Sequence, residues 1–163
     1  MREPGRAPGW ITREALESLS REASSAPRRR RNLNLHAMED PVHRLLNAME
    51  PGTYVRPHRH LHPPRSETAL VVAGRIGILF FDGAGNVLER RTLEAGGETL
   101  GADFPPGAWH TLVALLPGSV FFETKAGPYA PPPEEDLASW APPEGSAEAE
   151  RLERKWRGLF AGA

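Results

Sequence analysis

The 163-residue chain is long enough for one domain with a continuous core. Its 20 Lys and Arg residues against 21 Asp and Glu residues leave a net charge of -1, which excludes recruitment of nucleic acid or an anionic membrane by a global field. The absence of cysteine excludes disulfides, thiolate metal ligands and a cysteine nucleophile. Any metal chemistry must therefore rest on histidine and carboxylate.

No segment of the sequence predicts membrane insertion or export. The longest apolar run, residues 76–81, falls far short of the roughly twenty residues that cross a bilayer. The first ten residues carry two arginines, two prolines and two glycines without an apolar stretch, so we expect no secretory signal there. We therefore expect a cytoplasmic protein with neither a membrane nor nucleic acid among its partners.

The N-terminal region predicts one short helix at residues 13–26, because helix formers follow the N-cap residue Thr12 and stop at Pro27. Its apolar stripe consists of Ile11, Ala15, Leu16 and Leu19. Four arginines follow at 28–31. They are typical of a solvated connector or of an anion-binding patch, and we assign them no role.

From Asn32 the hydrophobic pattern alternates, which is typical of strands separated by turns rich in glycine and proline. We expect strands around Leu33 and Leu35, from Val42 to the turn at 51–52, and at 54–60, 67–72, 76–81, 87–93, 98–103, 109–115 and 119–124. Eight or more short strands without intervening helices predict an all-β sandwich or barrel.

After Gly127 the sequence is too rich in proline for a core strand, which predicts an extended arm over the surface. Ser146 can cap a final helix. The apolar stripe of that helix consists of Leu152, Trp156, Leu159 and Phe160. The chain thus divides into a leader and helix at 1–31, a β-barrel at 32–126, and a Pro-rich arm with a C-terminal helix at 127–163.

Two histidines at alternate positions, His58 and His60, stand in the expected strand 54–60. Residues two apart in a strand point to the same face with their Cα atoms about 6.6–6.8 Å apart, so both imidazoles can reach one metal ion. Glu67 begins the next apolar strand, where an antiparallel return can bring it beside the pair. His110 follows the turn at 105–107 and offers a fourth ligand.

Two motifs in this region are similar to those of the cupin superfamily. The first is matched by Gly52, His58, His60, Glu67 and Gly74. The second is matched by Pro105, Gly107 and His110. The resemblance implies a jelly-roll-like antiparallel β-barrel with one divalent metal ion inside, bound by the three histidines and the glutamate.

The chain departs from the cupin motifs in two places. Six residues separate His60 from Glu67 where three or four are usual, and neither Gly97 nor Gly101 stands at the usual distance before Pro105. The longer first gap contains His62, which is a competing ligand, although the prolines that follow it favour a loop position.

Several short stretches are similar to the WbuC-type cupin metalloproteins. They are NLNLH at 32–36, RLLN at 44–47, YVRPHRH at 54–60, FE at 122–123, GPYAP at 127–131 and WAP at 140–142. That family is associated with bacterial surface-polysaccharide gene clusters. The resemblance therefore implies a small-molecule ligand of the saccharide kind.

Three further residues form a candidate catalytic set. Glu123 is a candidate general acid or base, and Tyr54 and Lys125 lie on expected strands from which they can donate to an anionic sugar or acid. Each of these side chains can instead face solvent.

A second set of residues can bind substrate, and it consists of Arg44, Arg56 and His36. His36 and His43 alone are typical of hydrogen-bonded structural histidines, and only the family resemblance adds His36 to the ligand-binding set. Trp109, next to His110, is expected to pack on the opposite face of its strand.

Three imidazoles and one carboxylate suit Fe, Mn, Ni, Cu or Zn, and an octahedral ion would keep two positions open. This favours an enzyme that isomerises, epimerises or hydrolyses a sugar-like or hydroxy-acid ligand by Lewis-acid catalysis. The alternatives are a non-catalytic saccharide-binding or sensing module, an Fe(II) dioxygenase and a metal-free sugar epimerase. The cupin resemblance also implies a homodimer.

Overall fold

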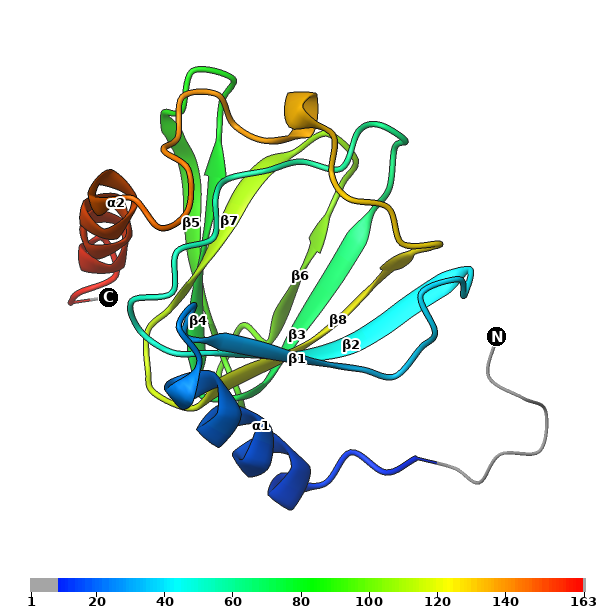
Figure 1. The fold of residues 1–163 in the computed structure, drawn as a ribbon. Helices are drawn as coiled ribbons and strands as arrows, with labels where there is room; N and C mark the ends of the chain where they lie inside the picture. Colours follow the sequence, from blue (N-terminus) through cyan, green and yellow to red (C-terminus); the bar gives the residue numbers. More distant parts are fainter. Residues whose placement is uncertain (1–8, 163) are drawn as a thin grey trace.

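Eight strands follow the alternating segments of the sequence in residues 9–162, the part of the chain that the computed structural model describes (Figure 1). They are β1 (Arg30–Asn34), β2 (Val42–Met49), β3 (Glu67–Ala73), β4 (Arg75–Phe81), β5 (Val87–Glu94), β6 (Gly101–Phe104), β7 (Trp109–Ala114) and β8 (Ser119–Ala126). Most of the expected N-terminal leader, residues 1–8, lies outside the described residues.

The strands form two antiparallel sheets, a larger one in the order β1-β2-β8-β3-β6 and a smaller one in the order β5-β4-β7. The register of the larger sheet pairs Glu67 with Lys125 across β3 and β8. The smaller sheet places His110 opposite Phe80 across β7 and β4. Residues for the site therefore come from facing sheets.

The main core lies between the sheets, and it is built from alternate residues of the strands, as period-two side-chain direction requires. Its buried members are Met49, Ala69, Val71, Ile76, Ile78, Leu93, Phe104, Leu112, Ala114 and Phe121. The antiparallel β architecture with a helix near each end of the chain is confirmed.

The outer face of the smaller sheet is covered by α2 (Ala147–Gly158), which Ser146 caps by accepting a hydrogen bond from the Ala149 amide. Trp156 and Phe160 pack there against Leu79 of β4. Gly77 makes this approach possible, because a Cβ at that position would lie 2.6 Å from the Phe160 ring.

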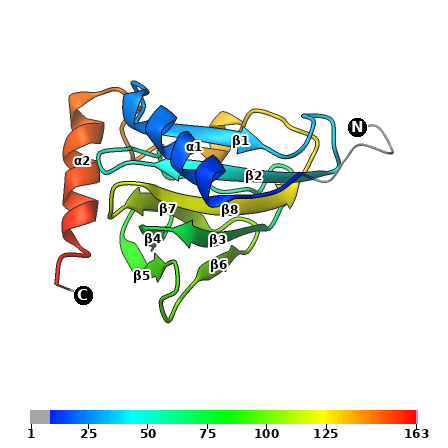
Figure 2. The same cartoon turned by 90° about the horizontal axis from the view of Figure 1, so that it is seen from below.

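The outer face of the larger sheet is covered by α1 (Arg13–Ser25), which lies across β1 and β2 in the view from below (Figure 2). Thr12 accepts a hydrogen bond from the Ala15 amide, as its N-cap role predicts. Leu19 and Ala23 are buried against Leu46 and neighbouring residues of the sheet. Both helices therefore begin after the predicted caps.

The prediction of a strand at 54–60 is wrong. Within the described residues, this segment forms only isolated bridges, in which His58 pairs with His110 and with Leu137. Pro57 has no amide hydrogen to donate to a ladder, which explains why a continuous pairing does not form. Two other boundaries also differ, because β6 begins at Gly101 rather than 98 and β1 includes the last two of the four arginines.

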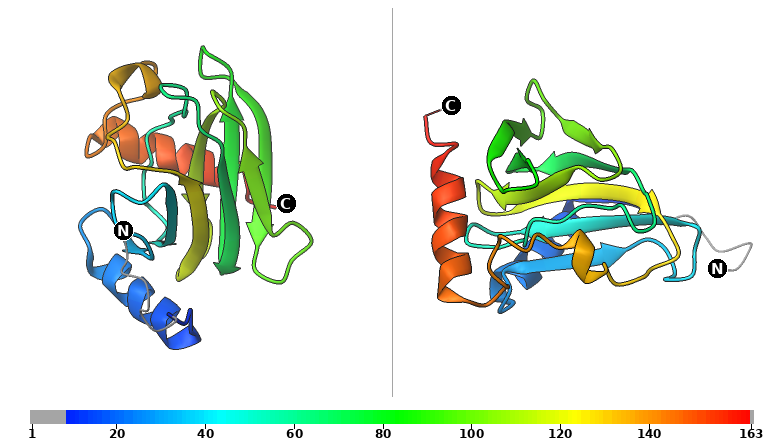
Figure 3. Two further views of the ribbon diagram at one scale, coloured as in Figure 1. Left: turned by 90° about the vertical axis from the view of Figure 1, so that its right-hand side faces the viewer. Right: turned by 90° about the horizontal axis from the view of Figure 1, so that it is seen from above.

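The segment between β8 and α2 runs across the same end of the two sheets as residues 54–62 (Figures 1 and 3). It contains the 3-10 helix η1 (Glu134–Asp136). The Arg59 amide donates to the Asp136 carbonyl, and the Ala138 amide donates to the Pro57 carbonyl. The expected surface arm is therefore partly buried and paired with the segment that carries His58.

None of the helices in the described part of the chain has the length and apolar character needed to cross a membrane.

Candidate metal centre

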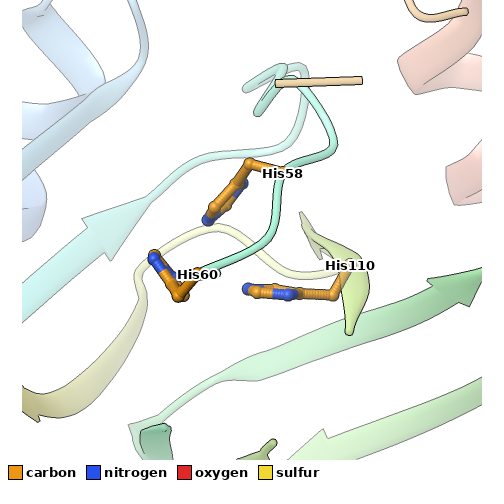
Figure 4. A group of neighbouring side chains, drawn as sticks. All are labelled: His58, His60 and His110. Carbon is orange, nitrogen blue, oxygen red and sulfur yellow. The ribbon is translucent and has the colours of Figure 1, made fainter. Parts of the chain in front are cut away.

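Three histidines converge at the end of the β-structure that residues 54–62 cross. His58 and His60 come from that segment and His110 comes from β7, and one ring nitrogen of each lies within 4.8 Å of the others (Figure 4). The His58 and His110 backbones exchange two hydrogen bonds, of 3.1 and 2.9 Å. This exchange joins the two cupin-like motifs directly.

Backbone carbonyls orient two of the rings. His58 Nδ1 lies 3.0 Å from the Arg56 carbonyl oxygen, and His110 Nδ1 lies 2.8 Å from that of Ala108. A carbonyl only accepts, so Nδ1 carries the proton and the Nε2 lone pair is free to bind a metal. His110 Nε2 is buried without a hydrogen-bond partner, which fits a ligand atom facing an ion.

The environment keeps the imidazoles of His58 and His110 neutral. Burial, followed by the nearby His110, lowers the pKa of His58 to about 3. Burial also lowers the pKa of His110. Because only a neutral imidazole offers a lone pair, the site is prepared for a cation rather than for an anion.

Glu67, at the start of β3, reaches the cluster through His60. Its Oε2 lies 2.8 Å from His60 Nε2, although the two atoms do not form a regular hydrogen bond, and 3.5 Å from Lys125 Nζ. Burial opposes ionisation of Glu67, but His60 and Lys125 outweigh it and hold the pKa of this carboxyl well below its usual range. This close approach of a carboxylate oxygen and an imidazole nitrogen suits two ligands of one ion, although Glu67 is not among the described residues whose ligand atoms cluster within 4.8 Å of one another.

A polar wall on β8 and β2 continues from Glu67. Lys125 Nζ lies 2.7 Å from Glu123 Oε1, and Asn47 Nδ2 donates to Glu123 Oε2 at 3.0 Å. Burial and the nearby Glu67 raise the pKa of Glu123. Burial alone would lower the pKa of Lys125, but the two carboxylates raise it, so the ammonium stays charged beside the histidines.

Tyr54 lies away from the cluster. Its ring stacks on Trp156, with the centroids 5.8 Å apart, and its hydroxyl donates to the Pro142 carbonyl at 2.8 Å. Burial raises the pKa of this hydroxyl to about 12. The structure therefore places Tyr54 between the smaller sheet and α2, and its side chain lines neither of the cavities beside the histidines.

The structure does not bring the three predicted substrate-binding residues together. His36 stacks on His43 with the centroids 4.1 Å apart, and its Nδ1 pairs with the Arg44 backbone. The Arg44 side chain lies 3.6 Å from Asp40 and is half exposed. Only Arg56 lines the cavity beside the histidines, where it donates to the Ala138 carbonyl.

The competing ligand His62 has a different partner. Its Nδ1 lies 2.9 Å from Asp136 Oδ1, and its amide donates to Asp136 Oδ2. The donor groups of Arg59, Leu61 and His62 hold the pKa of Asp136 at about 2, against the opposing effect of burial. Within the described residues, His62 therefore contacts the C-terminal segment and is not part of the histidine cluster.

Two cavities of about 450 and 460 Å³ meet at His58. They share the lining residues Arg28, Arg30, Val55, His58 and Lys125. Residues 130–133 of the C-terminal segment form part of the wall of the first cavity. Such volumes suit a small-molecule ligand.

Two arginines at the mouth of these cavities hold one carboxylate. Arg28 and Arg30 both pair with Glu144, with nitrogen–oxygen distances from 2.7 to 3.0 Å. No sequence pattern predicted a role for Glu144 or for Asp136. The contacts could not be predicted because the paired residues lie far apart in the chain. The arginines at 28–31 and the acidic residues of the arm were the local features that could have indicated ion pairs.

Several solved structures are similar in shape. KdgF from Halomonas sp. matches with a TM-score of 0.48 and 20% identity, over 62% of this chain and 80% of its own. A conserved protein of unknown function from Streptococcus pyogenes matches with a TM-score of 0.48 and 14% identity, over 64% of this chain and 80% of its own. Oxalate decarboxylase from Bacillus subtilis matches with a TM-score of 0.47 and 19% identity, over 62% of this chain but 25% of its own.

No curated protein matches the chain in sequence. The expected WbuC-type assignment receives no support from these comparisons. A family model described as a domain of unknown function, DUF6016, matches residues 11–93, about half of the chain. The matched region contains His58, His60 and Glu67 and ends before His110. The chain belongs to the DUF6016 family.

Proposed function

We propose that the protein is a cupin metalloprotein that binds one divalent metal ion through His58, His60, His110 and Glu67. The observation that carries this proposal is the convergence of three imidazoles, two of which are tied to backbone carbonyls through Nδ1 and offer Nε2. The motif order in the sequence and the two antiparallel sheets support the same proposal.

The donor set fits the first-row metals Fe, Mn, Ni, Cu and Zn, because imidazole and carboxylate are borderline and hard ligands. When bound, such an ion would polarise a carbonyl or hydroxyl oxygen of a ligand. The charged Lys125 would orient an anionic group next to it. Glu123, whose pKa is raised, would hold or accept a proton from the same side.

We propose a sugar-like or hydroxy-acid ligand, acted on by isomerisation, epimerisation or hydrolysis. Support comes from the size of the cavities and from their cationic lining, which includes Arg28, Arg30, Arg56 and Lys125. A role in surface-polysaccharide metabolism is supported only by the sequence resemblance described above.

A binding or sensing module without turnover is the second candidate. It is favoured by the pairing of the cavity arginines, because Arg28 and Arg30 already hold Glu144 and Arg56 holds the Ala138 carbonyl. Such a module predicts saturable ligand binding without product formation. Oxygen uptake in the presence of Fe(II) and ligand would instead indicate the dioxygenase alternative.

A homodimer is a further proposal. The edge strand β1 and the start of β2 carry the exposed apolar residues Leu33 and Val42, which a second subunit could cover. Light scattering at micromolar concentration should give twice the chain mass. A monomeric mass would contradict the proposal.

The metal proposal is tested by metal analysis of purified, untagged protein. We expect about one metal ion per chain in the wild type and little in the His58→Ala/His60→Ala double variant, since removal of two of the four ligands leaves an incomplete site. Inductively coupled plasma mass spectrometry, before and after reconstitution, measures both.

His62→Ala is the matched control, because His62 lies in the same segment but contacts Asp136. It should still bind about one metal ion per chain at saturating metal, because it leaves all four proposed ligands in place. Absence of metal from the wild type after aerobic and anaerobic preparation and after reconstitution would contradict the proposal. Loss of metal in His62→Ala equal to that in the double variant would show that the ligand set is wrong.

A further inference from the structure

Asp136 is a buried carboxylate that binds the outer side of the segment carrying His58 and His60. Its side chain is only 3% exposed. Asp136 Oδ2 accepts hydrogen bonds from the amides of Leu61 and His62, at 3.1 and 2.9 Å. Asp136 Oδ1 accepts from Arg59 Nε at 3.2 Å and lies 2.9 Å from His62 Nδ1. Each of these four contacts is thus with a nitrogen of residues 59–62, and the ionised carboxylate can only accept from it.

Among residues 9–162, no sheet ladder holds this segment in place. Its inner side is tied to the second motif, because the His60 carbonyl accepts a hydrogen bond from the Gly107 amide and His58 pairs with His110. Its outer side is tied to η1, since the Arg59 amide donates to the Asp136 carbonyl at 2.9 Å. The positions of the two imidazoles therefore depend on contacts from both sides.

Arg59 extends these outer contacts to the strand that carries the third histidine. It stands between His58 and His60, and its guanidinium lies against Asp136 and the Glu135 carbonyl. The same guanidinium carbon lies 4.6 Å from the centre of the Trp109 ring. Trp109 directly precedes His110 on β7. Asp136, Arg59 and Trp109 thus form a continuous chain of contacts from the C-terminal segment to the strand that carries His110.

We propose that Asp136 is a positioning residue of the metal centre, which keeps the ligands of the 58–60 segment at the spacing that one ion requires. The segment between β8 and α2 is then a component of the centre rather than a separate appendage. The inference rests on the proposed metal binding. Groups that orient metal ligands from behind typically change metal affinity by about 10- to 100-fold when removed.

The test is the isosteric variant Asp136→Asn. An amide offers one accepting oxygen and one NH2 group, so it cannot accept from all four donors, and two of them would face another donor. We expect Co(II) and Zn(II) to bind about 10- to 100-fold more weakly than to the wild type, measured by competition with a chromophoric chelator. The visible absorption spectrum of the Co(II) protein should also change, because its bands report ligand geometry.

Glu134→Gln is the matched control. It removes a negative charge two positions before Asp136, from a Glu134 side chain that is 82% exposed. It should leave the affinity and the Co(II) spectrum unchanged. Circular dichroism and the melting temperature of the metal-free proteins establish that the variants are folded. A lowered melting temperature with wild-type affinity and spectrum in Asp136→Asn would mean a structural role only and would overturn the inference.

Arg59→Gln decides the question if Asp136→Asn does not fold. Arg59 is partly exposed, and its loss removes the link from Asp136 to Trp109 while leaving the backbone contacts in place. Weakened Co(II) binding with an altered spectrum supports the inference, and wild-type binding overturns it. If the wild-type protein binds no metal in the same titration, the proposed function itself is contradicted. If Asp136→Asn and Arg59→Gln both bind metal as tightly as the wild type, only the role of Asp136 is contradicted.

Discussion

The N-terminal helix and the C-terminal segment are both extensions of the β-structure, but they contact it in different ways. Helix α1 buries Leu19 and Ala23 on the outer face of the larger sheet, away from the histidines. The segment between β8 and α2 instead contacts residues 54–62 through backbone pairs and the Asp136 carboxylate. An apolar stripe provides stability wherever it is placed, whereas directional polar contacts also position the groups that they touch.

The largest effect on stability should follow from Leu19→Ala, which leaves a cavity under α1. We expect the free energy of unfolding to fall by about 2–5 kcal/mol, because Leu19 is buried. Chemical denaturation measures this loss. Metal affinity of the folded protein should not change. If Leu19→Ala also weakened metal binding by the folded protein, the conclusion that only the C-terminal segment affects the histidine site would be contradicted.

Acid should weaken the C-terminal segment selectively. The pKa of Asp136 is about 2 in the folded protein, below its ordinary value near 3.8, so its ionised form contributes stability above about pH 4. That contribution should be lost as the pH falls from about 4 towards 2. Urea denaturation across this range measures the slope. The Asp136→Asn variant should lack this part of the pH dependence, and an identical slope in both proteins would contradict the assignment.

The smallest effect is expected from Glu144→Gln, which weakens the contact with Arg28 and Arg30 at the cavity mouth. The carboxylate is about one-third exposed, so we expect a loss of about 0.5–1 kcal/mol. Limited proteolysis should cut residues 127–145 faster than in the wild type. Glu148→Gln, which breaks an exposed pair with Arg151 on α2, serves as the control and should leave the proteolysis rate unchanged.

Much of the local structure was predictable because its causes lie within a few residues. Thr12 and Ser146 cap helices as predicted, and the alternating segments form strands with boundaries close to those expected. The prediction for 54–60 was wrong because alternation is not enough for a strand. Pro57 has no backbone N–H group to donate to a neighbouring strand. The residues that pair with this segment, such as His110 and Leu137, are distant in the sequence.

The candidate site was predictable in part for the same reason. The spacing of His58 and His60 and the turn before His110 are local features, and the structure brings these three residues together. Tyr54 and His36 lie elsewhere, because their partners Trp156 and His43 are determined by packing. No local pattern distinguishes a structural tyrosine or histidine from one that contacts a ligand.

By itself, the sequence determined the β class, the two capped helices and a histidine set suited to a metal, because hydrophobic period, capping and ligand spacing act over short distances. Only the tertiary structure decided that Asp136 is buried and that the C-terminal segment forms a wall of the site. The reason is that a carboxylate in an acidic, proline-rich stretch becomes buried only when donors from a distant segment satisfy it. Those donors, at residues 59–62, lie more than 70 positions earlier in the chain.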